Sequence, residues 1–318
     1  MIQQAGRSLP GPPPDLNHIV AEASRRAGVQ LGRFRLLRHF ATAVYLVEDV
    51  PVVVRVAYGA GSVERSGRAV KVARWLAAQH LPVTEPAAIP SGVGQPIVIE
   101  GHGEVAVTFW RYYPQPTRLP APDPEALARI ARALHDIRSP SPIPLPSYKP
   151  LRSIRRAVND SAAAERPGEQ HIAWLLQWLA QRIGELLSEY QTLSFPLGTG
   201  LIHGDMHTGN LLLSSGEYPA VLGDWDSVCV GPSEIDLAPT FSAPRFGLDP
   251  RCVDQFVAAY GYDLREWPGY PTLRAMRELS TLTALVRLAP TEPAAARELE
   301  HRLSSLWRGD TTVVWTRQ

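Results

Sequence analysis

The sequence has little of what secreted, membrane and nucleic-acid-binding proteins depend on. Its 318 residues include two cysteines, Cys229 and Cys252, too few for a disulfide framework or a zinc cluster. The 32 basic and 31 acidic residues leave a net charge of +1, which gives no basic surface for nucleic acid or anionic membrane. No apolar run approaches the ~18 residues that cross a bilayer, and the N-terminus lacks the apolar core of a signal peptide. We therefore expect a cytoplasmic globular protein without nucleic-acid or membrane partners, of unknown oligomeric state.

Lysine is almost absent as well. Lys71 and Lys149 are the two lysines among the 32 basic residues, and the others are arginine. Any chemistry that requires a lysine therefore has two candidates. The remaining composition, 45% apolar and 20% charged, is ordinary for a globular protein. The length suffices for a large core in one or two domains.

Residues 15–110 have the pattern of a small sheet with one main helix, after a proline-rich leader of residues 1–14 that we expect to be flexible. Short β-branched runs and one apolar stripe at helical spacing carry this prediction. The expected elements are, in order, a helix over 16–27, strands within 34–58, a helix over 63–80, and strands over 97–99 and 105–110.

The pattern becomes helical after this region. Residues 111–122 are expected to form a hinge, and residues 123–318 a larger helical region. Asp123 and Pro124 have the residue types of an N-cap and a first helical residue. A long amphipathic helix has its apolar stripe within 172–187.

A polar loop between apolar runs carries residues suited to phosphoryl transfer. Asp205 precedes Asn210 by five residues, and a predicted hairpin then leads to Asp224. A carboxylate can accept the proton of an attacking hydroxyl, while an amide oxygen and a second carboxylate can hold Mg²⁺ on nucleotide phosphates. The catalytic loop of kinases spaces its base and its metal-binding Asn in the same way, and a hairpin then delivers the metal-binding Asp. The three residues fit this arrangement.

The segment His203-Gly204-Asp205-Met206-His207-Thr208-Gly209-Asn210, followed by Asp224-Trp225-Asp226, resembles the aminoglycoside phosphotransferase and choline kinase family, relatives of the protein kinases. The resemblance implies an α+β, bilobal protein-kinase-like fold. In it, a β-rich N-lobe (15–110) would bind the nucleotide, and a helical C-lobe (123–318) would carry the catalytic loop and the acceptor site. It also implies a kinase that uses ATP or GTP with Mg²⁺.

The resemblance assigns roles to the acidic residues of this part of the chain. It implies that Asp205 is the catalytic base and that Asn210 and Asp224 hold the metal. Asp236 would brace the catalytic loop. Asp226 would either assist the metal or face solvent, and we favour solvent.

The nucleotide-binding strand departs from the usual pattern of kinases. The run Val52–Val56 resembles the third strand of the small lobe, which usually carries a lysine for the phosphates, and neither Lys71 nor Lys149 can serve there. Arg55 stands at that position and keeps the charge with a different geometry. Glu64 is the best available partner for it, the alternative being a solvated carboxylate at a helix start.

Two further segments resemble nucleotide-binding parts of the family. Arg111, Tyr112 and Tyr113 resemble the hinge, whose backbone groups would bind the nucleotide base. The glycine-rich lid over the phosphates is reduced to Phe40-Ala41-Thr42-Ala43, where Thr42 is the expected phosphate contact.

Two other functions stay open. A kinase-like module that binds nucleotide without turnover is suggested by the missing lysine. A metallohydrolase would use His203, Asp205, His207 and Asp224, although metal sites of that kind prefer richer histidine clusters.

The acceptor is expected to be a small hydroxylated molecule, because the family phosphorylates antibiotics, choline, sugars and metabolites. From Glu234 onward, 11 acidic residues stand against 10 arginines, which does not favour a strongly cationic acceptor such as an aminoglycoside. Antibiotic resistance and metabolism therefore both stay open as the role.

Overall fold

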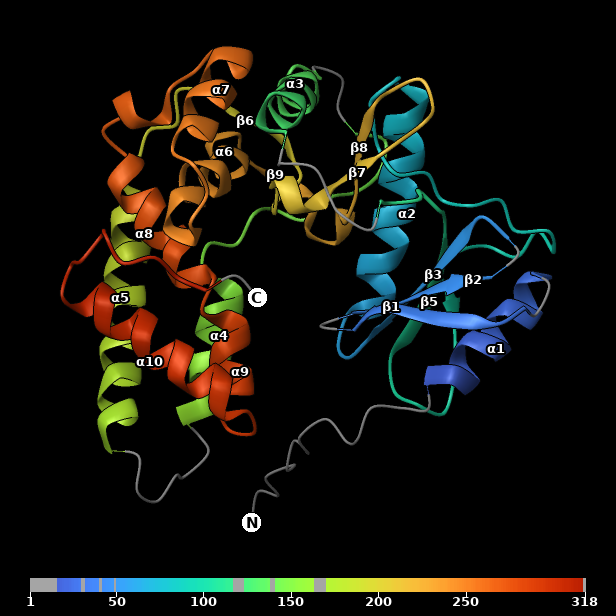
Figure 1. The fold of residues 1–318 in the computed structure, drawn as a ribbon, viewed down its shortest axis with the longest axis horizontal. Coiled ribbons are helices and arrows are strands. Elements are labelled where there is room, and N and C mark those ends of the chain that lie inside the picture. Colours follow the sequence, from blue (N-terminus) through green and yellow to red (C-terminus); the bar gives the residue numbers. More distant parts are fainter. Residues whose placement is uncertain are drawn as a thin grey trace. The chain divides into compact units, whose positions relative to one another are not determined.

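The computed structural model describes residues 16–29, 32–39, 42–48, 50–116, 123–137, 141–162 and 170–316 (Figure 1). The chain divides into two compact units, each with its own core. The first holds the described residues up to 116, together with 141–145 and 209–228. The second holds the other described residues. The predicted leader and residues 117–122 of the predicted hinge lie outside the described residues.

The first unit is built on an antiparallel sheet of five strands in the order β1-β2-β3-β5-β4. Two helices accompany it, α1 (Leu16–Ala27) and α2 (Ser62–Ala78). The predicted small sheet with one main helix is confirmed. Its strands are β1 (Phe34–His39), β2 (Thr42–Val47), β3 (Val52–Tyr58), β4 (Ile97–Val98) and β5 (Val105–Arg111).

The alternation of side chains along β3 decides which residues enter the core of the first unit. Val54 and Val56 are fully buried and share a cluster with Ile19 and Val20 of α1. Because successive side chains of a strand point to opposite faces, Arg55 points to the other face of the sheet. On that face α2 packs against β3 and β5 (Figure 1). The sheet therefore lies between the two helices, with Arg55 on the α2 side.

A short hairpin far along the chain also belongs to the first unit. It consists of β7 (Leu211–Leu213) and β8 (Ala220–Leu222), followed by the 3-10 turn η2 (Trp225–Ser227). The Thr84 amide donates to the Leu222 carbonyl at 2.9 Å, and the Leu222 amide donates to Pro82 at 2.9 Å. Backbone pairing thus joins the hairpin to the unit that carries the sheet, although its sequence lies between helical segments.

The second unit is mainly helical, as predicted. Asp123 caps α3 by accepting a hydrogen bond from the Ala126 amide at 2.7 Å, as the pattern Asp123-Pro124 indicated. The helices are α3 (Pro124–His135), α4 (Arg152–Ala162), α5 (Gln170–Gln191), α6 (Glu234–Phe241), α7 (Arg251–Tyr260), α8 (Tyr270–Ser280), α9 (Thr283–Leu288) and α10 (Pro293–Trp307). One ribbon of two strands, β6 (Thr199–Ile202) and β9 (Cys229–Pro232), accompanies them, with the 3-10 turns η1 (Thr208–Asn210), η3 (Ala243–Phe246) and η4 (Leu264–Glu266) elsewhere in the chain.

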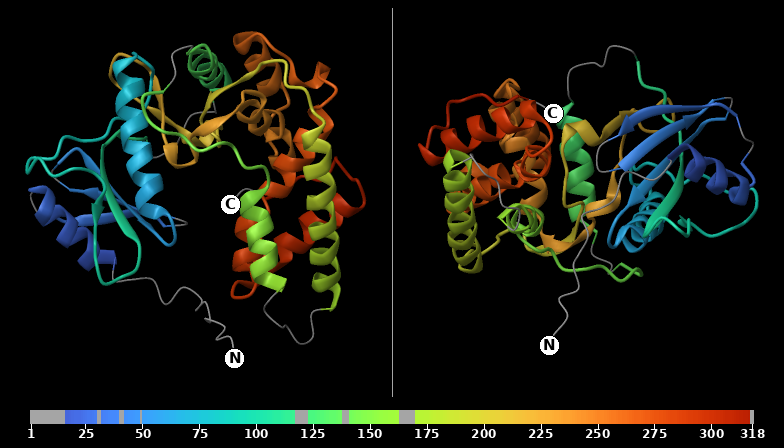
Figure 2. Two further views of the ribbon diagram at one scale, coloured as in Figure 1. Left: turned by 180° about the vertical axis from the view of Figure 1, so that it is seen from behind. Right: turned by 90° about the horizontal axis from the view of Figure 1, so that it is seen from below.

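The main core of the second unit includes a helix that the sequence pattern did not indicate to us. Ile154, Ala157 and Val158 of α4 are almost fully buried against residues of α5, α8, α9 and α10. In Figure 2 α5 runs beside α4 and α10, in agreement with their contacts. None of the helices in the described ranges has the length and apolar character needed to span a membrane.

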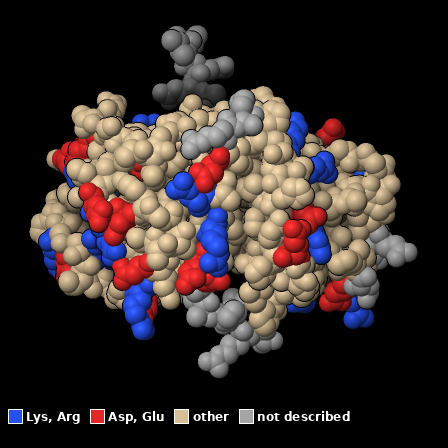
Figure 3. Space-filling view, turned by 90° about the horizontal axis from the view of Figure 1, so that it is seen from above, with Lys and Arg blue, Asp and Glu red and all other residues tan. Residues whose placement is uncertain are grey.

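Charges of both signs are mixed over the surface seen in Figure 3, with blue and red side chains side by side. The ion pairs of the described residues include several between residues one helical turn apart, such as Arg132 with Asp136 at 2.9 Å. The balanced net charge therefore reflects a mixed surface on that face.

Candidate active site

The hairpin of the first unit brings Asn210 and Asp224 to the same end of one structure. In the β7–β8 ladder Leu211 lies opposite Leu222, and one step further the Gly223 amide donates to the Asn210 carbonyl at 2.9 Å. Asn210 therefore precedes the first strand and Asp224 follows the second at the same end. The spacing of the two residues in the sequence is explained by this short ribbon.

The backbone at Asp224 is held in an unusual conformation. Its φ and ψ of 63° and 58° lie in the left-handed region, which costs free energy for a residue with a side chain. The next residue, Trp225, is fully buried, and its indole nitrogen donates to the Leu222 carbonyl at 3.0 Å. The buried indole thus anchors the turn in which the Asp224 backbone is strained. Strain of this kind is typical of functional residues.

Arg55 is the cation that meets this carboxylate. Its Nη2 donates to Asp224 Oδ1 at 2.8 Å and to Asp226 Oδ2 at 3.1 Å, and its side chain is 12% exposed. Burial acts to lower the pKa of Arg55, but the charges of Asp226 and Asp224 outweigh it and raise the pKa above its ordinary value. Asp226, which we expected in solvent, is therefore a second partner of Arg55.

The expected pair between Glu64 and Arg55 is not the arrangement found. Glu64 is 82% exposed and accepts a hydrogen bond from Arg68, one turn along α2, at 3.2 Å. The carboxylates that face Arg55 come instead from the segment after β8. The prediction failed because the partners of Arg55 lie about 170 residues away in sequence, where no local pattern points to them.

Arg38 is a residue of this site that sequence reasoning missed. Its Nη2 lies 3.7 Å from Asp224 Oδ2. Between Leu36 and Arg38 the register of β1 shifts, so that Arg38 pairs with Val44, which in turn pairs with Arg55. The shift places Arg38 on the same face of the sheet as Arg55. Simple alternation would have placed it on the face of α1.

The predicted hinge residues are partly engaged within the first unit. The amides of Arg111 and Tyr112 donate to the carbonyls of Glu85 and Pro51 at 2.9 and 2.8 Å, which removes both donors from the groups expected to bind a nucleotide base. The Arg111 guanidinium also pairs with Glu85 at 3.2 Å. The Tyr113 hydroxyl accepts from the Glu85 amide, and burial raises the pKa of Tyr113.

The predicted lid is only partly described. Thr42 begins β2, where it pairs with Ala57 and is half-buried. Phe40 and Ala41 lie outside the described residues. A phosphate contact by Thr42 stays a prediction.

The second unit holds the loop that carries Asp205, and Asp236 supports this loop. Asp236, at the start of α6, is fully buried and accepts hydrogen bonds from the amides of His203 and Gly204 at 2.7 and 2.8 Å. His135 of α3 lies 3.2 Å from the same carboxylate. The predicted brace is confirmed by these bonds. Gly204 has a φ of 83°, which glycine adopts without strain just before Asp205.

Asp205 itself is surrounded by cationic and histidine groups of the second unit. Arg277 of α8 donates to its Oδ1 at 3.1 Å, and His207 Nε2 lies 3.8 Å from its Oδ2. Its own amide donates to the His203 ring at 3.3 Å. Burial acts to raise the pKa of Asp205, but His207, Arg277 and His203 hold it well below the usual range. The group is therefore a carboxylate at any ordinary pH.

Arg277 is the second contact that sequence reasoning did not assign. No local pattern in the sequence connects Arg277 with a loop 72 residues earlier. Helical spacing could have placed Arg277 on the polar side of α8, but only packing shows that it meets Asp205.

Asn210 and Asp224 have the donor types that a magnesium ion takes in proteins, an amide oxygen and a carboxylate. In the part of the chain that the structure describes, no three or more His, Cys, Asp and Glu side chains lie together as a metal cluster. The metallohydrolase alternative, which needs such a cluster, gains no support.

The chain matches the model of the phosphotransferase enzyme family over residues 33–279. A comparison with curated proteins gives no match. Among solved structures, it is similar to the amicoumacin kinase hAmiN in complex with AMP-PNP, Ca²⁺ and Ami. The TM-score is 0.66 at 14% identity, over 95% of this chain and 96% of the other.

Two more solved structures are similar over most of their length. The microcompartment-associated aminopropanol kinase has a TM-score of 0.66 at 22% identity, over 91% of this chain and 94% of the other. The aminoglycoside phosphotransferase APH(3'')-Id from Streptomyces rimosus has a TM-score of 0.56 at 20% identity, over 84% and 98%. These likenesses confirm the predicted α+β, protein-kinase-like fold class, with a sheet in the N-terminal region and helices in the C-terminal region.

Proposed function

Because the chain belongs to the phosphotransferase enzyme family, we propose that it is a small-molecule kinase that transfers the γ-phosphoryl group of ATP or GTP to a hydroxyl group. One observation carries the proposal. A single hairpin presents Asn210 and a strained Asp224 at the same end, and Asn210 follows Asp205 by five residues. This is the order of a base, an amide ligand and a carboxylate ligand that phosphoryl transfer by kinases uses.

In this reaction Asp205 orients the acceptor hydroxyl and takes its proton as the oxygen attacks the γ-phosphorus and the nucleoside diphosphate leaves. A carboxylate with a low pKa is a weak base, so its main contribution is orientation, with the proton accepted late in the transfer. Asp236 serves this step indirectly, because it fixes the amides of His203 and Gly204 beside Asp205.

Asn210 and Asp224 would hold Mg²⁺, which when bound neutralises the charge of the phosphate oxygens. Arg55, with Arg38 beside it on the sheet, would bind the nucleotide phosphates in place of the usual lysine. Arginine suits this role because its planar fork donates to two oxygens of a phosphate at once. In the structure Arg55 is paired with Asp224 and Asp226, so binding of a metal nucleotide would exchange these partners.

The acceptor that we propose is a small hydroxylated molecule. The similar proteins include an aminopropanol kinase and an aminoglycoside phosphotransferase. The nearly balanced charge from Glu234 onward favours an acceptor with few positive charges over a polycation. An amino alcohol or a neutral hydroxylated compound fits better than an aminoglycoside.

The proposal is tested by measuring nucleoside diphosphate release from ATP and from GTP with Mg²⁺. The acceptor panel contains amino alcohols, choline, sugars and aminoglycosides. At least one acceptor should stimulate release, and the Asp205→Asn variant should lower kcat by about 10²–10⁴-fold. Asp160→Asn is the matched control, because its side chain on α4 is 72% exposed. It should change kcat less than about twofold.

The outcomes separate the competing functions. Nucleotide binding by calorimetry without release for any acceptor would favour the nucleotide-binding module. Undiminished turnover of Asp205→Asn would remove that residue from the role of base.

A further inference from the structure

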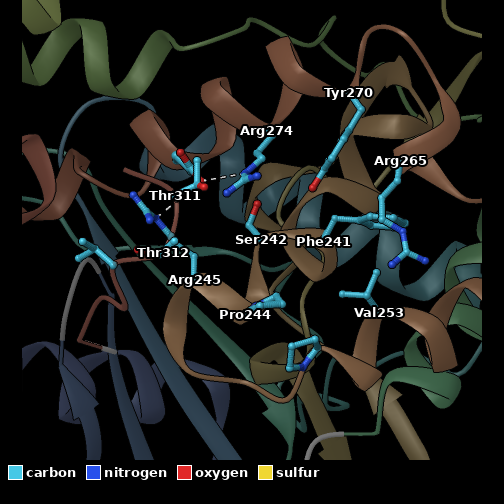
Figure 4. Close-up of a pocket in the computed structure, with 13 residues that line it drawn as sticks. Phe241, Ser242, Pro244, Arg245, Val253, Arg265, Tyr270, Arg274, Thr311 and Thr312 are labelled. Carbon is cyan, nitrogen blue, oxygen red and sulfur yellow. Dashed lines mark hydrogen bonds and ion pairs between the residues drawn. The ribbon is translucent and has the colours of Figure 1, made fainter. Parts of the chain in front are cut away.

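The second unit contains a pocket of about 350 Å³, which we call the Arg245 pocket (Figure 4). It is formed by the end of α6, the turn η3, the helices α7 and α8, and a segment after α10. Among the described residues, none of those proposed for phosphoryl transfer lines it. Its volume is that of sites that bind small organic molecules.

Arg245 is the most unusual residue of this pocket. Its side chain is 3% exposed, and its guanidinium lies over the Trp315 ring at 4.3 Å. Nη2 donates to Ser305 at 3.2 Å, but Nε and Nη1 meet no hydrogen-bond acceptor among the described residues. Buried N–H groups without acceptors cost free energy, more so on a charged group. Arg245 therefore has donors that suit a bound acceptor.

Two carboxylates act on Arg245, but among the described residues neither accepts a hydrogen bond from its Nε or Nη1. Glu278, itself almost buried, lies 3.8 Å from Arg245 and accepts a hydrogen bond from Arg274 at 3.1 Å, so two guanidinium groups share one carboxylate. Asp310 also acts on Arg245, but its carboxylate accepts from the Thr312 amide and hydroxyl at 2.9 and 2.7 Å. Asp310 thus contributes charge but accepts its hydrogen bonds from Thr312, and a bound oxyanion would supply the acceptor that the buried N–H groups of Arg245 lack.

The third arginine of the lining differs from these two. Arg265 pairs with Asp254 and with Asp263, each at 2.8 Å. Its charge is therefore already matched by two carboxylates. Among the arginines of the lining, Arg245 is therefore the one with buried donors that lack an acceptor.

Apolar side chains form part of the opposite side of the pocket, where Arg265 also lies. In Figure 4 Phe241 and Val253 lie across from the guanidinium groups of Arg245 and Arg274. Hydroxyl groups of Ser242, Tyr270 and two threonines also line the pocket, together with Pro244, Pro250 and Val313. The pocket thus combines a cationic end with an apolar wall, an arrangement suited to a molecule with one anionic head and an apolar body.

We propose that the Arg245 pocket binds a small organic oxyanion, with its carboxylate or phosphoryl group on Arg245 and Arg274 and its apolar part against Phe241 and Val253. This binding site is separate from the residues proposed for phosphoryl transfer. It stands whether or not the chain is a kinase.

The test is calorimetric titration of the whole chain with three probes that share a ring. Phenyl phosphate and benzoate carry the two anionic heads, and benzyl alcohol is the neutral counterpart. Saturating ADP and Mg²⁺ are present, so that any nucleotide site is filled. At least one anion should bind about tenfold more tightly than benzyl alcohol, and which anion binds better identifies the head group.

Arg274→Gln is the decisive variant, because its side chain is 32% exposed and its loss is tolerable for folding. It should weaken anion binding by about tenfold. Arg251→Gln is the matched control, since Arg251 is 84% exposed and does not line the pocket. It should leave the affinity within about twofold. Arg245→Met, with its fold checked by circular dichroism, should abolish binding.

Three results would overturn the proposal. These are no heat from either anion, equal affinity for benzyl alcohol and the anions, and unchanged anion affinity in Arg274→Gln.

Discussion

Two aspartates of this molecule are bound by different kinds of group. Asp236 of the second unit is fully buried and is bound by two backbone amides and a histidine. Asp224 of the first unit is 33% exposed, sits on a strained backbone, and is bound by the guanidinium of Arg55, with that of Arg38 nearby. The backbone amides that bind Asp236 are fixed in place by the fold. The arginine side chains at Asp224 can rotate away and bind other groups.

This difference divides the proposed site into two parts. The loop of Asp205, supported by Asp236, is fixed before a ligand binds, and the ion pairs of Asp224 would change when a metal nucleotide binds. Backbone donors preorganise the loop of Asp205 before any ligand is present. The ion pairs of Asp224 instead hold charges that a metal nucleotide would redistribute. We therefore expect changes at Asp236 to act on stability, and changes at Arg55 to act on nucleotide binding.

The largest expected effect is that of Asp236→Asn. The amide oxygen can still accept one hydrogen bond, but the amide nitrogen cannot accept the second, so one backbone N–H loses its acceptor. Breaking a buried charged network in this way should lower the free energy of unfolding by about 2–4 kcal/mol. Urea-induced unfolding followed by tryptophan fluorescence measures it.

Asp263→Asn is the matched control for that variant. Asp263 also accepts from a backbone amide, that of Arg265 at 2.9 Å, but its side chain is 19% exposed, whereas Asp236 is fully buried. Its replacement should cost less than about 1 kcal/mol. Equal losses in the two variants would contradict the idea that burial makes the support at Asp236 special.

A second, smaller effect is expected at Arg55. Arg55→Met leaves the carboxylates of Asp224 and Asp226 without their shared cation, and both are partly exposed to water. The KM for ATP should rise by about tenfold, since a charged contact to the phosphates is lost, and Arg55→Lys should recover part of it. Steady-state kinetics at saturating acceptor measures both.

Arg35→Met serves as the control, because Arg35 lies on β1 with its side chain 57% exposed and its partner Glu48 at 3.9 Å. It should change the KM less than about twofold. If Arg55→Met lowered the free energy of unfolding as much as Asp236→Asn while leaving the KM unchanged, the contrast between the two regions would be wrong.

The sequence predicts the parts of this molecule that depend on local patterns. The cap at Asp123, the strand around Arg55 and the hairpin between Asn210 and Asp224 were all predictable, because spacing and residue type indicate them. The support by Asp236 followed from the resemblance of its segment to the family and is confirmed by hydrogen bonds.

What could not be predicted depends on packing between distant segments. The register shift in β1 places Arg38 on the same face of the sheet as Arg55. The one extra residue that causes it cannot be located from the alternation of side chains in the sequence. We predicted Glu64, on the helix that follows β3, as the partner of Arg55. The partner in the structure is Asp224, which follows β8. Helix α4 was not predicted, although Leu151, Ile154 and Val158 have helical spacing.

The smallest expected effect concerns the ion pair between Asp205 and Arg277. This pair is partly exposed, in contrast to the buried hydrogen bonds of Asp236. Their side chains are 41% and 26% exposed, so water and salt screen the attraction. A double-mutant cycle with Asp205→Asn and Arg277→Gln should give a coupling of about 0.5 kcal/mol in the free energy of unfolding at pH 7, and less in high salt.

The pH dependence of this coupling has a definite sign. The pKa of Asp205 is lower in the folded chain than the value of about 3.9 for an unfolded aspartate, so the pair stabilises the fold fully above that value. The coupling should therefore be constant from about pH 8 to pH 5 and decline only as the pH falls below about 4 toward the folded pKa. A coupling that vanished between pH 7 and pH 5 would show that Asp205 is not held as a carboxylate. A coupling above about 2 kcal/mol would show that this contact, like that of Asp236, belongs to the fixed part of the site.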